Sequence, residues 1–268
     1  MKLEDAVSTG EPRPMDPLVE ALTPAQVHRD VDEFIALFDA GSKEEDVHQF
    51  LATHSYFFNN HLRLLSVCPL YSKIRLGSEF TTDFAWFDTS SFGPEWTFVE
   101  IESAAGRMFT KSGEPSALLN HAIQQARDWQ QWISDNIAYA REQFPHVSYP
   151  MCYVFVGRRS EFTPSTVKRL RKLSYDHRAH LKIHTLDNFV GNALSVLELM
   201  KLRGGAGNWY VPMCALTHAE FAARKPEGAW KYLAAKGHDE TLRYYHDMRI
   251  GSRISVATTP EVIYEDDD

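Results

Sequence analysis

The feature that most constrains the fold is a run at residues 96–103, in which apolar and acidic side chains alternate. Val99 and Ile101 share one face of an extended chain there. Glu100 and Glu102 share the other face, about 6–7 Å apart along the chain. This period of two predicts a half-buried β-strand. Because like charges repel when they are partly buried, the two carboxylates need a proton or a cation between them.

A second acid lies upstream in a similar setting. Asp83 comes just before the aromatic-rich run at residues 84–87. If the two runs are neighbouring antiparallel strands, Asp83 reaches the face that carries Glu100. Three carboxylates, those of Asp83, Glu100 and Glu102, then converge on one point, which suits a hard cation such as Mg²⁺ or Mn²⁺. The alternative, which the pattern alone leaves open, is that the two glutamates form the solvated face of an ordinary strand.

Composition indicates a globular protein without a membrane partner. The 268 residues can bury a large core, and 44% hydrophobic with 24% charged residues is typical of such chains. No apolar run reaches 18 residues, and the acidic start at residues 1–5 lacks the apolar stretch of a signal peptide. Cys68, Cys152 and Cys214 are far apart and show no metal-type spacing. We therefore expect a reduced, cytoplasmic location.

The net charge of −8 argues against a general nucleic-acid coat protein, but it hides an asymmetry. Residues 157–182 contain eight basic and two acidic side chains, so this segment carries +6 and the rest of the chain −14. A local basic patch can bind phosphates. It can equally be the solvated face of a helix, and both interpretations stay open.

Periodicity, with proline and glycine as punctuation, predicts a chain of helices and strands. Two N-terminal helices are opened by Thr23-Pro24 and by the capping box at residues 42–45. Three closely spaced strands predict an antiparallel meander, and the later strand–helix–strand order predicts parallel neighbours. The expected strands cover residues 71–76, 81–87, 95–102, 151–156 and 181–185. The expected later helices cover residues 116–144, 165–175 and 187–202.

The same pattern divides the chain into four segments. Residues 1–22 contain three prolines and predict a flexible N-terminal arm, followed by an N-terminal helical segment at 23–66. Residues 67–203 form the expected core. Residues 204–268 form a C-terminal extension that ends in an acidic tail. Within this extension we expect a short strand at 210–211 and short helices at 217–224 and 226–236.

Seven short stretches carry a resemblance in their order and spacing: Glu44 with Phe50-Leu51, Arg75-Leu76-Gly77, Thr82-Asp83-Phe84, and residues 98–102, 121–129, 154–159 and 183–187. Together they resemble the PD-(D/E)XK nuclease superfamily, and more closely the nuclease domain of the Shedu anti-phage defence family. The resemblance implies an α/β fold of the restriction-endonuclease type. In that fold a mixed central sheet is flanked by helices, here with N-terminal helices and a C-terminal extension.

The resemblance also implies a chemistry. Asp83 and Glu100 would hold Mg²⁺ or Mn²⁺, and a metal-activated water would cleave DNA phosphodiester bonds in antiviral defence. Glu44 would be a further ligand or would orient a water; alternatively it only favours the dipole of its helix. Gln125 matches a helix glutamine of the family that faces the site, where an amide can position a phosphate or a water. Gln124 points about 100° away from it, and a surface role for Gln125 stays open.

One position departs from the superfamily pattern. Where the general motif has E-x-K, this chain has Glu100-Ile101-Glu102, a variant that also occurs among Shedu-like relatives. A lysine from elsewhere can fill the role. Lys111, nine residues further on, is our candidate, with Lys73 and Arg75 as the other options. Lys111 can also be an ordinary solvated loop residue, and without a cation Glu102 would be another metal ligand.

The remaining partners follow from the same resemblance and from absent motifs. The basic residues expected to contact DNA are Arg158, Arg159, Lys168 and Arg171. The superfamily's habit of assembly implies a homo-oligomer. No Walker-type or G-x-G-x-x-G motif is present, so no nucleotide cofactor is expected. We interpret the twelve histidines as packing or surface residues.

Two other functions stay open at this point. The chain could be a binding or regulatory module that keeps the nuclease fold but has lost cleavage, which the E-x-E run and the overall acidity favour. A cation from Lys111 or a neighbour within about 4–6 Å of Glu102 would argue against that. The chain could also be a scaffold whose acids lie only on the surface, which predicts an exposed Glu100.

Overall fold

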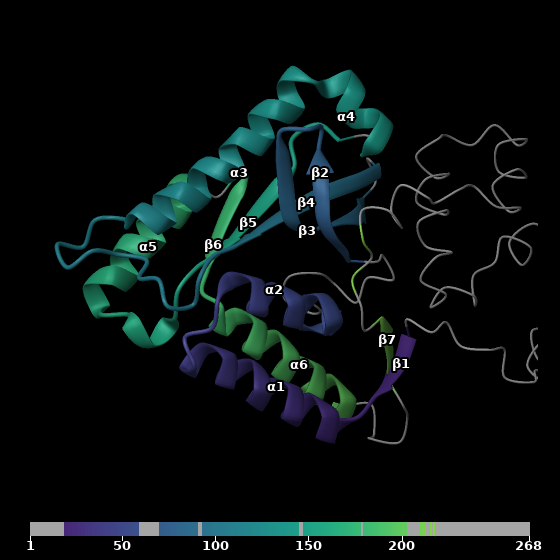
Figure 1. Cartoon of the computed structure of the whole chain (residues 1–268), viewed down its shortest axis with the longest axis vertical. Coiled ribbons are helices and arrows are strands. Elements are labelled where there is room, and N and C mark those ends of the chain that lie inside the picture. Colours follow the sequence, from purple (N-terminus) through teal and green to yellow (C-terminus); the bar gives the residue numbers. More distant parts are fainter. Residues whose placement is uncertain are drawn as a thin grey trace, which may run out of the picture.

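A mixed five-stranded sheet lies at the centre of the protein, with helices on both of its faces (Figure 1). The structure is a computed structural model that describes residues 19–58, 70–90, 93–144, 147–177, 179–202 and 209–212, with residues 215 and 217. Most of the predicted arm, the two predicted C-terminal helices apart from residue 217, and the acidic tail lie outside the described residues.

The order of the elements follows the prediction. The helices are α1 (Pro24–Asp39), α2 (Glu44–Thr53), α3 (Ala117–Asp135), α4 (Ile137–Gln143), α5 (Pro164–His177) and α6 (Asp187–Leu202), with short 3₁₀ turns at Ser55–Phe58 and Arg159–Glu161. The strands are β1 (Val19–Leu22), β2 (Tyr71–Leu76), β3 (Phe80–Ser90), β4 (Gly93–Ile101), β5 (Met151–Phe155), β6 (Leu181–His184) and β7 (Trp209–Pro212).

The central sheet has the strand order β2-β3-β4-β5-β6. β2, β3 and β4 pair antiparallel, whereas β5 pairs parallel with β4 and with β6. The predicted meander and the predicted parallel neighbours are therefore both confirmed. This is the predicted fold class, a mixed sheet flanked by helices in the order of a restriction-endonuclease-like core.

Each face of the sheet has its own core. α1, α2 and α6 cover one face, where aromatic side chains dominate; α3, α4 and α5 cover the other (Figure 1). Because strand residues alternate between faces, Phe84 and Val99 belong to the first core, whereas Ala85 and Phe98 belong to the second. The predicted N-terminal helical segment is thus part of the main core.

The structure departs from the prediction in the long helix expected at residues 116–144. The chain forms two helices, which meet at Asn136 with φ −117° and ψ 32°. The Asn136 side chain donates a hydrogen bond from Nδ2 to the carbonyl of Trp132 (2.9 Å). Asparagine competes in this way for helix carbonyls, which explains why the helix ends there.

The two ends of the described chain meet in a second, two-stranded sheet. β1 pairs antiparallel with β7, so Val19 lies opposite Pro212 and Leu22 lies opposite Trp209. The last four residues of the predicted flexible arm therefore form a strand, and its partner is the strand expected near residues 210–211 in the C-terminal extension. Local sequence patterns do not predict pairing between two strands that lie about 190 residues apart in the chain.

Candidate active site

Asp83 and Glu100 come together on the face of the sheet that α3 covers. In the β3–β4 register Phe84 lies opposite Val99, and one further step places Asp83 opposite Glu100. The Ile101 backbone N–H donates a 2.7 Å hydrogen bond to Asp83 Oδ2, which fixes the aspartate against the end of β4. The neighbourhood predicted from the two runs is therefore present.

Both glutamates of the E-x-E run are buried. Glu100 and Glu102 are each 6% exposed, and Asp83 is 5% exposed. The alternatives of a solvated strand face and of a scaffold with surface acids are therefore wrong. Burial first, and then the negative charges of Asp83 and Glu102, raise the pKa of Glu100 to about 10. Without a metal, Glu100 thus holds a proton at neutral pH.

Glu44, on α2, also lies close to this cluster. It is the first residue of α2 and is exposed. Partial burial and then the charges of Asp83 and Glu102 raise its pKa, so its carboxylate lies within electrostatic reach of both. The structure thus brings four of the predicted site residues together: Glu44, Asp83, Glu100 and Glu102.

The cation in this cluster is Lys73, from β2. Its Nζ lies 2.6 Å from Asp83 Oδ1, and its side chain is 42% exposed. Partial burial disfavours the charged ammonium, but the charge and the hydrogen bond of Asp83 outweigh this, so the pKa of Lys73 is raised. Lys111, our candidate for this role, is exposed in the loop before α3 and makes no ion pair or hydrogen bond with the described residues.

Two histidines complete the surroundings, and neither was singled out from the sequence. His48 lies buried behind Asp83, with Nε2 3.3 Å from the Asp83 carbonyl oxygen and its ring stacked on Phe84. Burial and the Lys73 charge lower the pKa of His48. His121, at the start of α3, has Nδ1 3.2 Å from Glu102 Oε1. The group beside Glu102 is therefore an imidazole rather than a lysine.

Gln125 lies one helical turn after His121 on α3. Residues four apart share a face of a helix, so Gln125 lies on the side of α3 that faces Glu102. Gln124 is exposed, and its Nε2 donates to Asp128 Oδ1 (2.7 Å). This supports the choice of Gln125 over Gln124. The same four-residue spacing from Gln125 could have indicated from the sequence that His121 faces the site.

The predicted DNA-contacting residues fall into two groups. Arg158 is largely buried: its Nε donates to Asp187 Oδ1 (3.2 Å), and its guanidinium lies over the Phe38 ring. These contacts tie α1 to the end of β5. The side chains of Arg159, Lys168 and Arg171 are exposed.

The acid cluster offers carboxylate oxygens, the donors that hard divalent cations prefer. No group of three or more His, Cys, Asp or Glu side chains within the described ranges is arranged to hold one. At Asp83 each carboxylate oxygen accepts one hydrogen bond, Oδ1 from Lys73 Nζ and Oδ2 from the Ile101 N–H. The donor chemistry nevertheless fits a hard divalent cation, because buried carboxylates outnumber the one lysine and repel each other.

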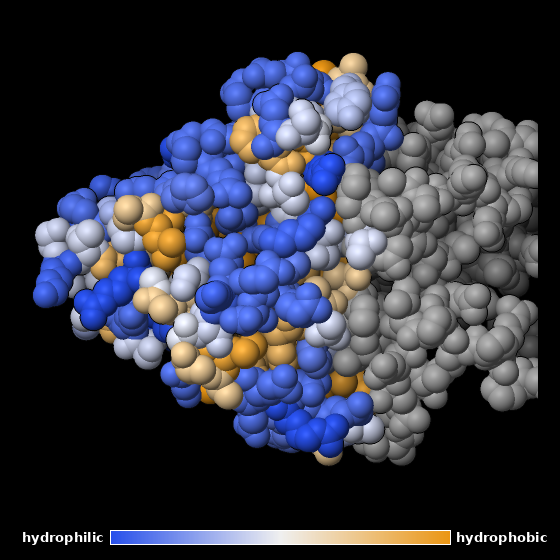
Figure 2. All heavy atoms as spheres, in the orientation of Figure 1, coloured by the Kyte–Doolittle hydropathy of each residue, from blue (hydrophilic) through white to orange (hydrophobic). Residues whose placement is uncertain are grey.

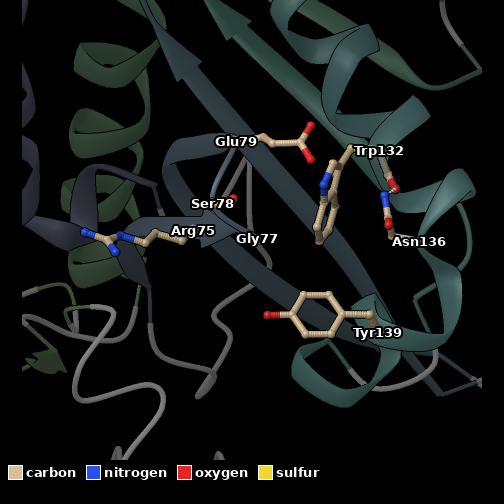
Figure 3. Close-up of a pocket in the computed structure, with 7 residues that line it drawn as sticks. All are labelled: Arg75, Gly77, Ser78, Glu79, Trp132, Asn136 and Tyr139. Carbon is tan, nitrogen blue, oxygen red and sulfur yellow. Dashed lines mark hydrogen bonds between the residues drawn. The ribbon is translucent and has the colours of Figure 1, made fainter.

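A separate open cavity of about 490 Å³ lies where the β2–β3 turn meets α3 and α4 (Figure 3). Trp132 and Tyr139 meet edge to face on one side, with the Glu79 carboxylate opposite (Figure 3). Gly77, with φ +59°, lies so close to the Trp132 ring that a side chain there would clash. Arg75, the other cation option named from the sequence, lines this cavity, whereas none of the four acids of the site does.

The described part of the surface is mainly hydrophilic on the face seen in Figure 2. This face carries α1 and α2 and shows small separate apolar patches. Among the helices of the described ranges, none combines the length and apolar character that a bilayer span needs.

Comparison with known proteins shows which family the chain belongs to. No curated protein matches the chain. Among solved structures, restriction endonuclease FokI bound to DNA shares 13% identity over 68% of this chain and 33% of that chain, with a TM-score of 0.35. This chain therefore spans a third of that protein's length. The family model described as Shedu protein SduA, C-terminal, matches residues 41–190, which include every acid of the site. The chain belongs to the Shedu family.

Proposed function

We propose that the protein is a metal-dependent DNA endonuclease of anti-phage defence whose centre is the Asp83–Glu100–Glu102 cluster. The observation that carries the proposal is the burial of these three carboxylates at one end of the sheet, within the segment that matches the Shedu family. Burying like charges costs free energy, and an arrangement of this kind is commonly found at functional sites.

The residues have distinct roles in this proposal. Asp83 and Glu100 would hold Mg²⁺ or Mn²⁺, with Glu102 and Glu44 as further oxygen donors. The bound metal would supply charge neutralisation on the phosphate and a hydroxide near neutral pH. Gln125 would position the phosphate or a water from α3. Lys73, not Lys111, is the lysine that contacts the cluster, so it would balance the charge of the acids while the metal is absent.

The DNA backbone would lie along the basic segment that includes α5. Arg159, Lys168 and Arg171 are exposed and can each approach a phosphate. Arg158 would act indirectly, since its guanidinium is held by Asp187 and Phe38. By resemblance to the family the active form would be a homo-oligomer, which sedimentation of the purified chain measures.

The test compares cleavage of supercoiled and linear DNA by wild type and by Glu100→Gln, with Mg²⁺ and then with Mn²⁺. We expect metal-dependent cutting by wild type and a loss of more than about 100-fold in the variant, since even outer partners of metal ligands are worth 10–100-fold. Glu95→Gln is the matched control, because Glu95 lies on the same strand and is exposed. Cutting that survives Glu100→Gln would place the active centre elsewhere.

A second candidate is a nucleic-acid-binding or regulatory module that has lost cleavage. The observation that favours it is the Lys73–Asp83 ion pair, which fills the cation position of the cluster. The outcome that would support this candidate is DNA binding, measured by fluorescence anisotropy, without cutting by wild type in either metal. In that case Arg171→Ala should still weaken binding, with a smaller salt dependence than wild type.

A further inference from the structure

We propose that Lys73 is the resident counter-ion of this site: a positioning residue whose ammonium occupies the cation place beside Asp83 and gives it up to a divalent metal. The inference rests on the proposed metal site and adds a regulator of metal loading to it. The relevant feature of β2 is one residue, Lys73, at which the alternation of side chains between the two faces is broken.

Lys73 is the one non-glycine residue with a positive φ, 51°, among the residues that the structure describes. A lysine side chain disfavours this left-handed conformation, particularly within a strand. The consequence is visible in packing. Tyr71, Ile74 and Leu76 all enter the core under α3, although strict alternation would put Tyr71 and Ile74 on opposite faces. Because Lys73 is left-handed, the β2 side chains after it point to the opposite face of the sheet from the one that alternation predicts.

The pairing of β2 with β3 shows that this reversal is not a slip in register. Ser72 pairs with Phe84 and Ile74 with Thr82, so Lys73 stays level with Asp83, although these two residues do not pair through their backbones. The unusual conformation instead delivers the lysine side chain to the aspartate, with Nζ 2.6 Å from Oδ1. Strained residues of this kind persist where the surroundings hold them in place and are concentrated at functional sites.

The surroundings of Lys73 explain why it can act as a replaceable cation. Asp83 is buried, and an unpaired buried carboxylate is unfavourable, so a metal-free site needs a positive group there. Lys73 is 42% exposed, so its ammonium can leave toward solvent on its flexible stem. The negative charges of Glu44 and Glu45 at the start of α2 also attract the ammonium. The displaced ammonium could therefore pair with these carboxylates.

Competition follows from these distances. The Lys73 ammonium, with Nζ 2.6 Å from Asp83 Oδ1, occupies one approach to that oxygen, and a divalent ion bound to the same oxygen would be repelled by it. In this proposal, metal binding therefore displaces Lys73. Removing the ammonium should raise the affinity for metal, whereas a lysine with a purely structural role predicts lower stability and no gain in affinity.

The experiment measures binding of Mn²⁺ alone to the full chain, by the electron paramagnetic resonance signal of the free ion, without DNA. We expect Lys73→Met to bind Mn²⁺ at least about tenfold more tightly than wild type. Lys111→Met is the matched control, since Lys111 makes no contact with the acids, and its affinity should stay within about twofold of wild type. Equal or weaker binding by Lys73→Met, or an equal rise in Lys111→Met, would overturn the inference.

Two further variants keep the test decisive. Lys73→Gly adopts a positive φ without strain and also lacks the ammonium, so it should show the same gain if Lys73→Met fails to fold. Lys73→Arg keeps a cation and should bind Mn²⁺ like wild type. If Glu100→Gln abolishes cutting while neither Lys73→Met nor Lys73→Gly gains affinity, the inference is wrong and the nuclease function stands. If neither wild type nor any variant binds Mn²⁺, both the inference on Lys73 and the proposed metal site fail.

Discussion

Two faces of one sheet, separated by a single residue along β3 and β4, have opposite physical character. Phe84 and Val99 point into the core under α1, α2 and α6. Their neighbours Asp83 and Glu100 point to the face covered by α3. The first face is built from interlocking rings, whereas the end of the second gathers like charges. The same backbone thus carries both an aromatic core and a cluster of buried acids.

The aromatic face shows how the charged end is tolerated. The Phe34 ring contacts the rings of Phe38, Phe50, Phe57 and Phe189, with centroids 4.5–6.1 Å apart. Such buried ring clusters dominate core energetics. The acid cluster, by contrast, is held in an arrangement that its own charges oppose. Both faces have an apolar core, but only the α3 face also holds the buried acids among the described residues.

The largest expected effect comes from breaking the aromatic face. Phe34→Ala removes a fully buried ring with four ring contacts. It should lower the free energy of unfolding by about 3–5 kcal/mol, as measured by urea denaturation. Tyr149→Ala is the control, because Tyr149 is about half exposed, and it should change stability by about 0.5 kcal/mol or less. A similar small loss in Phe34→Ala would show that the aromatic face does not carry the stability.

The next effect concerns pH and the charged end. Burial raises the pKa of Glu100 from its ordinary value of 4.5 to about 10, so the folded protein keeps a proton that the unfolded chain loses. This contribution to stability is complete below about pH 4.3, the value in an unfolded chain, and is lost as pH rises toward 10. With chelator present, wild type should lose up to about 1.4 kcal/mol per pH unit from this group.

The matched variant isolates that contribution. Glu100→Gln has the shape of the protonated acid but cannot ionise, so urea denaturation from pH 5 to 9 should show a shallower decline than in wild type. At pH 9 the variant should be the more stable protein. Parallel pH profiles for the two proteins would mean that Glu100 is already ionised in the folded protein. The repulsion among the buried acids would then be weaker than we infer.

The sequence predicted the frame of the fold because local signals agreed with tertiary packing. Alternation placed β3 and β4, and the apolar run at Met151–Phe155 predicted a buried parallel strand. Asp83 and Glu100 were predicted together because one hairpin joins their strands. The resemblance to the Shedu family was confirmed by the match over residues 41–190. The break at Asn136 was missed because a single polar side chain decides it.

Lys73 and His121 show what local patterns do not contain. Nothing around Lys73 in the sequence indicates its positive φ, and its partner Asp83 lies ten residues away on the next strand. Lys111 was preferred for its place in a loop after the strand, a judgement of chain distance rather than of packing. His121 meets Glu102 only because α3 packs against the end of β4, which the helical period alone does not specify.

The smallest expected effect tests His121, whose Nδ1 lies 3.2 Å from Glu102 Oε1. Its side chain is 69% exposed, and exposed pairs contribute little, so His121→Ala should change the free energy of unfolding by less than about 1 kcal/mol. The pKa of Glu102, which burial raises and His121 lowers, should rise further in the variant. Carbon-13 titration of the Glu102 carboxyl measures this shift. Gln124→Ala, on the exposed side of α3, should leave it unchanged. If His121→Ala shifted stability but not the pKa of Glu102, the histidine would belong to the packing of α3 rather than to the acid cluster.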